Sequence, residues 1–72
     1  MHFQRVIKQL KERRESLGVT QDMLADISGV SLRAIKQFES GKGNPTLHTL
    51  SKLSEALGLE LGLHAISKQA DA

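Results

Sequence analysis

Apolar residues recur along most of this 72-residue chain at the spacing of an α-helix. From Phe3 they fall three and four positions apart, which places them on one side of a helix facing a core. Three further stretches repeat this spacing, and each follows a Thr or Ser that can cap a helix and precedes a glycine that can end one. The pattern predicts helices over residues 3–17, 20–28, 31–40 and 46–57. The side chains expected to face the core are Phe3, Val6, Ile7, Leu10, Leu17, Leu24, Ala25, Ile27, Ala34, Ile35, Phe38, Leu47, Leu50, Leu53 and Leu57.

A different period begins in the stretch LELGLHAI, residues 59–66. Apolar and other residues alternate there, which is typical of a half-buried β-strand. A single strand leaves its backbone donors and acceptors unpaired along both edges. We therefore expect it to pair antiparallel with the same segment of a second copy, forming a homodimer. The residues expected to make this dimer contact are Leu59, Leu61, Leu63 and Ile66.

The length and composition predict one small domain over residues 1–72, ending in a flexible tail at 67–72. Cysteine, Trp and Tyr are absent, so the core is aliphatic apart from two Phe residues, and no disulfide stabilises it. A core of this size supplies only about 3–5 kcal/mol, which favours association with a second chain. The net charge of +2 permits an anionic partner without requiring one.

The sequence lacks the patterns that would indicate several other functions. No apolar run approaches the roughly 18 residues of a membrane span, and the start of the chain does not resemble a signal peptide. This predicts a cytoplasmic protein without a membrane partner. His2, His48 and His64 are too scattered for a metal site, and no nucleophile is ordered beside a base. We expect no enzyme activity, no cofactor and no metal.

The two short helices predicted within residues 20–41 are not stable alone and must pack at a fixed angle against other helices. Ala25 is small where they approach each other, and Gly29 can adopt the positive φ that a tight turn requires. Val30, Ile35 and Phe38 then fill the crossing. This combination predicts helix-turn-helix geometry.

These residues also carry a resemblance. The stretch TQDMLADISGVSLRAIKQFESGKGNPTLHTLSKLSEALG is similar to the Cro/lambda-repressor-like (XRE) helix-turn-helix family, whose pattern is TQ-x-x-LA-x-x-x-GVS-x-x-x-I-x-x-x-E-x-G. The match covers residues 20–41, with support at 44–58. The resemblance implies a mainly α, four-helix domain that binds double-stranded DNA. It also implies that Arg14 pairs with Glu39, a pair that we expect to brace the fold.

The resemblance implies DNA contacts by named residues. An α-helix fits the major groove, where the start of the second helix of the motif reaches the bases. The implied base contacts are Leu32, Arg33 and Gln37. Arg33 suits a guanine, Gln37 suits an adenine or a phosphate, and Leu32 either meets a thymine methyl or packs against the protein.

Phosphate contacts are expected from residues on the recognition helix and on its flanks. Helix N-termini attract anions, and polar loop residues can hold the other flank of a site. The expected residues are Thr20, Gln21, Ser31, Lys36, Lys42, Asn44 and Thr46. Thr20, Ser31 and Thr46 have the alternative role of helix caps only, and Lys42 that of a solvated side chain.

The passage from the fourth helix directly into a short strand resembles the HipB-type antitoxins. That resemblance implies a repressor of its own operon that also neutralises a kinase-fold toxin. In a dimer, two recognition helices would lie about 34 Å apart on a palindromic operator. The alternatives are a stand-alone XRE-type regulator without a toxin and a protein-interaction module that binds DNA weakly.

Overall fold

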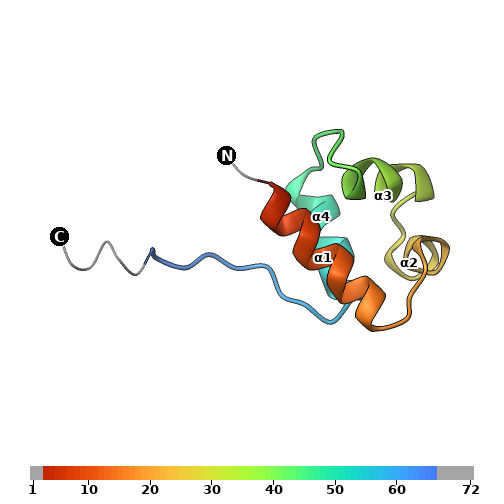
Figure 1. The fold of residues 1–72 in the computed structure, drawn as a ribbon, viewed down its shortest axis with the longest axis horizontal. Helices are drawn as coiled ribbons and strands as arrows, with labels where there is room; N and C mark the ends of the chain where they lie inside the picture. Colours follow the sequence, from red (N-terminus) through yellow and green to blue (C-terminus); the bar gives the residue numbers. More distant parts are fainter. Residues whose placement is uncertain (1–2, 67–72) are drawn as a thin grey trace.

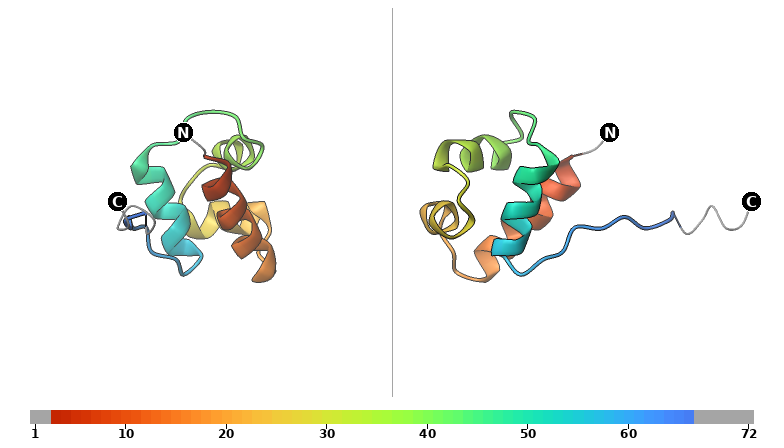
Figure 2. Two further views of the ribbon diagram at one scale, coloured as in Figure 1. Left: turned by 60° about the vertical axis from the view of Figure 1, so that its left-hand side comes forward. Right: turned by 180° about the vertical axis from the view of Figure 1, so that it is seen from behind.

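The computed structural model describes residues 3–66, which contain four helices. They are α1 (Gln4–Ser16), α2 (Gln21–Ser28), α3 (Leu32–Glu39) and α4 (Leu47–Ala56). Helix α2 packs against α3 and α4, and α1 packs against α3. The four helices surround a single core, and the chain after α4 leads away from it (Figures 1 and 2). The predicted mainly α, four-helix architecture is confirmed. None of the helices in the described part is long and apolar enough to span a membrane.

Three helices begin at the predicted capping residues. The hydroxyl oxygens of Thr20, Ser31 and Thr46 each accept a hydrogen bond, at 3.1 Å, from the backbone N–H three residues ahead. Such a bond satisfies one of the free N–H groups in the first turn and contributes about 1 kcal/mol. The capping role of these three residues is therefore confirmed.

The end of α4 is fixed by a glycine. Gly58 has a φ of +73°, which lets the N–H of Leu59 turn back and donate to the carbonyl of Ser54 at 2.8 Å. This is a Schellman motif, and α1 and α3 end in the same way. Arg13 of α1 adds a bond from its Nε to the carbonyl oxygen of Leu57, at 2.9 Å. The direction in which the chain leaves α4 is therefore set by both α4 and α1.

The core consists of seven buried apolar residues drawn from all four helices and the turn between α2 and α3. Ile35 is completely buried, and Leu53 and Leu57 are nearly so. Partly buried apolar residues, including Val6 and Ala25, pack around them. The full set is Leu10, Leu24, Val30, Ile35, Phe38, Leu53 and Leu57.

Four of the predicted core residues are instead exposed to solvent. Ile27 is 59% exposed, because an eight-residue helix buries one narrow side and Ile27 lies on its flank. Leu47 is 75% exposed, since it is the first residue of α4 and the helix is first buried at Leu53. The other two, which lie at or next to the ends of α1, are Phe3 and Leu17.

The predicted β-strand at 59–66 is not confirmed. Within residues 3–66 no strand is present, and the segment after α4 runs as an extended stretch away from the helices (Figures 1 and 2). A strand exists only when it is hydrogen-bonded to another, and the described chain offers no extended partner. Leu59 packs partly against the core, whereas Leu61, Leu63 and Ile66 are exposed. The tail predicted at 67–72 lies outside the described residues.

Candidate nucleic-acid interface

Helix α3 is held in place by a buried ion pair. Arg14 of α1 donates from Nε to Glu39 Oε2 at 2.7 Å and from a terminal nitrogen to Oε1 at 3.0 Å. Its other terminal nitrogen donates to the carbonyl oxygen of Val19 at 2.7 Å. The two charged side chains are only 10% and 5% exposed. The structure therefore brings Arg14 and Glu39 together in a two-bond contact that fixes the end of α3 to α1.

Gln21, at the start of α2, joins this pair. Its side-chain Nε2 donates to Glu39 Oε1 at 2.9 Å. Sequence reasoning assigned Gln21 to a phosphate and missed this contact. No local pattern signals it, because the two residues are 18 positions apart in the chain. One carboxylate thus receives hydrogen bonds from both α1 and α2.

The surroundings of the pair favour its charged state. Burial acts to raise the pKa of Glu39, but hydrogen bonds from Arg14 and Gln21 and nearby positive charge outweigh it, so the pKa lies below its ordinary value of 4.5. The hydrogen bond to Glu39 raises the pKa of Arg14 despite burial. Both groups are therefore charged at neutral pH, and the angle between α1, α2 and α3 is set by charge as well as by apolar packing.

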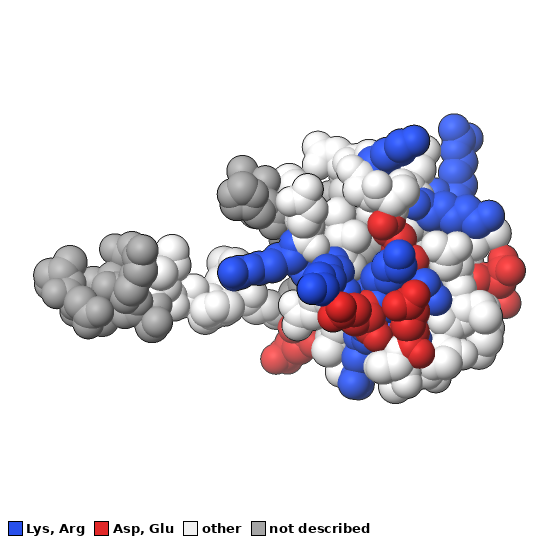
Figure 3. Space-filling model, viewed as in Figure 1, with Lys and Arg blue, Asp and Glu red and all other residues white. Residues whose placement is uncertain are grey.

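The side of α3 that faces away from the core is exposed to solvent. Arg33, Lys36 and Gln37 are all exposed, whereas Ile35 and Phe38 of the same helix are buried. In Figure 3, Lys and Arg side chains occupy the upper right edge, where Figure 1 shows α3, and basic and acidic groups are mixed over α1. A short helix therefore presents a polar, basic surface to the solvent.

Leu32, at the first position of α3, lies between the buried side and the exposed side of that helix. It is half-buried, yet it is not part of the core cluster or of the apolar residues packed around it. Ser31, directly before it, is exposed and caps the helix. Both interpretations of Leu32, contact with a thymine methyl and packing, are compatible with this position.

Four of the predicted contact residues line one open hollow beside the end of α3. Gln37 comes from α3, Lys42 and Asn44 come from the loop, and Thr46 caps α4. Thr20 and Ser31 lie instead at the starts of α2 and α3. The structure therefore separates these six predicted contacts into a cluster around the hollow and two helix N-termini.

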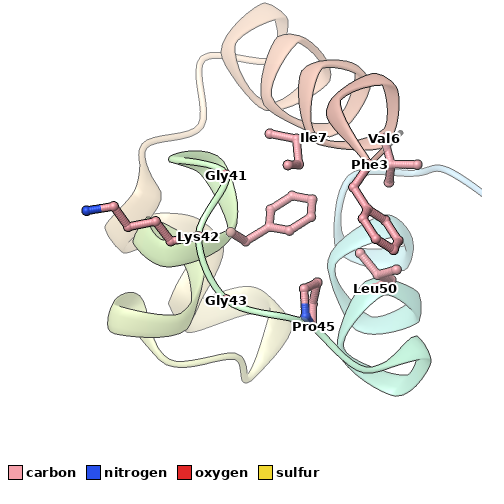
Figure 4. A pocket seen from close by; sticks show the side chains of 9 residues that line it. Phe3, Val6, Ile7, Gly41, Lys42, Gly43, Pro45 and Leu50 are labelled. Atoms are coloured by element: carbon pink, nitrogen blue, oxygen red, sulfur yellow. The ribbon is translucent and has the colours of Figure 1, made fainter. Parts of the chain in front are cut away.

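The far side of the same loop is apolar. A cavity of about 50 Å³ lies between the start of α1, the loop and α4. Figure 4 shows Phe3, Ile7 and Leu50 around this cavity, while Lys42 points away from it. The loop thus packs against apolar side chains on one side and offers polar groups on the other.

The structure contains two short helices, α2 and α3, which cross at an angle fixed by the bonds to Glu39. The outer side of α3 is exposed. This is the arrangement of a helix-turn-helix domain. The model of the helix-turn-helix family matches residues 10–63. The chain therefore belongs to the helix-turn-helix family, as its resemblance to XRE-type proteins implied.

Curated relatives give the same result. The cryptic phage CTXphi transcriptional repressor RstR of Vibrio cholerae is 35% identical over 57 residues, covering 79% of this chain and 51% of RstR. An uncharacterized HTH-type transcriptional regulator of Haemophilus influenzae is 41% identical over 58 residues, 81% of this chain and 59% of that protein. The HTH-type transcriptional regulator PuuR of Escherichia coli is 39% identical over 54 residues, 75% of this chain and 29% of PuuR.

The chain thus spans only part of the length of each of these three relatives. No solved structure gives a significant match. The three names describe regulators and a repressor, so the prediction of an antitoxin with a kinase-fold toxin partner receives no support from them.

Proposed function

We propose that this chain is a DNA-binding transcriptional regulator that acts as a repressor, with α3 lying in the major groove. The observation that carries the proposal is the free outer side of α3, whose Arg33 and Gln37 are exposed while Glu39 is held inside. The major groove admits an α-helix, and a guanidinium can donate two hydrogen bonds to a guanine. Arg33 is the residue proposed for that contact. Gln37 is proposed to contact an adenine or a phosphate.

Phosphate contacts are proposed on both flanks of α3. The hollow lined by Lys42, Asn44 and Thr46 offers an ammonium, an amide and the start of α4 on one side. The start of α2, capped by Thr20, offers backbone N–H groups on the other. Such contacts position a protein on DNA without reading its sequence.

We propose binding rather than catalysis. Within residues 3–66, no three His, Asp or Glu side chains gather in a way that would hold a metal ion. The buried Glu39 is already occupied by Arg14 and Gln21, so it is not free to act as an acid or a base. This leaves surface recognition as the function that the side chains support best.

The regulator is further proposed to bind a palindromic operator as a homodimer. The extended segment 59–66 carries the exposed Leu61 and Leu63, which water would otherwise surround. Pairing with the same segment of a second copy would cover these leucines and satisfy the backbone. It would also provide two recognition helices for one duplex.

Titration of labelled operator DNA at several salt concentrations tests DNA binding. The logarithm of the affinity is expected to fall linearly with the logarithm of salt, with a slope of about −0.9 for each phosphate contacted. A flat response would contradict the proposal and favour a protein-interaction module.

Two substitutions separate base contact from phosphate contact. Arg33→Ala is expected to weaken the cognate operator by about 1–3 kcal/mol and unrelated DNA hardly at all, because it removes a base contact. Lys42→Ala is the matched control, with one basic side chain also lost, and it should weaken both DNAs equally and reduce the salt slope by about 1. Equal losses for Arg33→Ala would show a phosphate contact instead.

Leu61→Glu tests the dimer. A charge on the leucine side should shift the protein to monomer in analytical ultracentrifugation, because two carboxylates would be buried in the contact. An unchanged dimer would place the interface elsewhere.

A further inference from the structure

Gly62 stands in the middle of segment 59–66, and nothing in the described chain accounts for it. Each of the other five glycines has a positive φ, between +70° and +82°, whereas Gly62 does not. A Cβ at Gly62 would meet no atom within 4 Å among the described residues. Glycine weakens an extended stretch and often marks a place where another backbone approaches closely. Gly62 therefore points to contact with a second chain.

The residues around Gly62 are arranged so that the segment complements itself. Leu61 and Leu63 stand one position to either side, and Glu60 and His64 stand two positions away. In an antiparallel pair centred on Gly62, each residue faces the residue equally far beyond Gly62 in the other copy. Leu61 then faces the partner's Leu63, and Glu60 faces the partner's His64. A pair centred on Glu60 would instead place two carboxylates opposite each other.

We propose that two copies pair antiparallel with their Gly62 residues opposite each other, which gives the dimer of the proposed function a defined register. Because alternate residues of an extended chain share a side, the leucines lie together and Glu60, Gly62 and His64 lie on the other side. Ile66 belongs to that second side, although the sequence suggested that it joins the leucines.

The leucines of segment 59–66 share a groove with apolar residues of α1. The groove runs between α1 and the segment, and Val6, Leu10 and the three leucines line it together with polar residues that include Glu60 and His64. Leu63 is fully exposed in the single chain, and Leu61 is 40% exposed. A second leucine row from the partner would continue this apolar surface and remove both side chains from water.

Single cysteines test the register directly, because the chain has no cysteine of its own. Residues that face each other across an antiparallel pair have Cα atoms about 4.5–5.5 Å apart, which suits a disulfide. Gly62→Cys is therefore expected to form a covalent dimer in oxidised glutathione. Glu60→Cys should not, because its two copies would lie about 13 Å apart, four positions along the strands. The same holds for His64→Cys, but an equimolar mixture of Glu60→Cys and His64→Cys should form the covalent heterodimer.

Each result bears on the register. Faster cross-linking of Leu61→Cys or Leu63→Cys with itself would overturn the register in favour of a pairing shifted by two residues. A mixture of Glu60→Cys and His64→Cys that fails to cross-link would also overturn it. Adding Leu61→Glu to Gly62→Cys should abolish the covalent dimer, and persistence of the dimer would indicate random collision. The readout does not involve DNA, so a failed cross-link beside intact DNA binding would refute the register alone.

Exchanging the charges at positions 60 and 64 gives a second, independent test of the register. Glu60→Lys should raise the dissociation constant of the dimer in sedimentation equilibrium by about 2- to 30-fold, because two cross-strand pairs are lost. Combining Glu60→Lys with His64→Glu should restore the affinity, since a Lys then faces the partner's new carboxylate. A combined variant no tighter than Glu60→Lys alone would show that positions 60 and 64 do not face each other. All these positions are exposed and outside the core, so the helical domain stays folded in each variant.

Discussion

Replacing Arg14 by Met is expected to remove most of the stability of the protein. The substitution leaves the carboxylate of Glu39, whose side chain is 5% exposed, without its cationic partner. It also deletes the two hydrogen bonds to Glu39 and the one to Val19. Removal of one partner from a buried ion pair costs about 3–5 kcal/mol. A single core in a chain of this length supplies only about 3–5 kcal/mol, so Arg14→Met should be largely unfolded at 25 °C.

Urea unfolding followed by far-ultraviolet circular dichroism, at one fixed protein concentration, measures this loss. The matched control is the double variant Arg14→Met with Glu39→Leu, which replaces both charges by apolar groups. It should be more stable than Arg14→Met alone, because no unpaired charge remains buried. A loss below about 1 kcal/mol for Arg14→Met would mean that the pair behaves like an exposed one, and the reasoning would fail. A double variant less stable than Arg14→Met would refute it as well.

Acid should act on the same pair. Because the pKa of Glu39 in the fold lies below 4.5, its contribution is complete above that pH and is lost as the pH falls through the lower value. Below about pH 4.5 the urea midpoint should therefore fall less steeply with pH in Glu39→Gln than in the unsubstituted protein. Glu12→Gln, at an exposed position, should not have this effect. An equally steep fall in both variants would contradict the role assigned to Glu39. On α2, Leu24→Ala should cost about 2–5 kcal/mol and Ile27→Ala no more than about 0.5 kcal/mol, because Leu24 is 2% exposed and Ile27 59%. Similar losses in the same urea experiment would contradict the burial pattern.

The helices could be predicted from the sequence because their ends depend on near neighbours. The hydroxyl of Thr20 reaches an N–H only three residues ahead, and Gly58 turns the chain through bonds to carbonyls a few residues back. The helix-turn-helix motif is also local, since Ala25, Gly29 and Ile35 define it within one short stretch. Both kinds of signal are contained in a window of the sequence.

The remainder depends on contacts between distant parts of the chain or with other molecules. Ile27 fits the spacing of a core residue, yet it lies on the flank of α2 and stays in solvent. Gln21 has the composition of a surface residue, and only the folded chain brings it to Glu39. The alternation at 59–66 predicts a strand that the described chain does not form, because pairing requires a second strand. The base and phosphate contacts stay predictions for the same reason, since a partner completes them.

In α3, the residues that hold the helix in place are different from those exposed on its outer side, and this has a practical consequence. Glu39, Ile35 and Phe38 hold the helix from within, whereas Arg33 and Gln37 make none of the contacts that hold it. Positions 33 and 37 can therefore be exchanged without disturbing the scaffold. If α3 lies in the major groove as proposed, the domain is a suitable scaffold for libraries in which these outer residues are randomised to select binders of chosen DNA sequences.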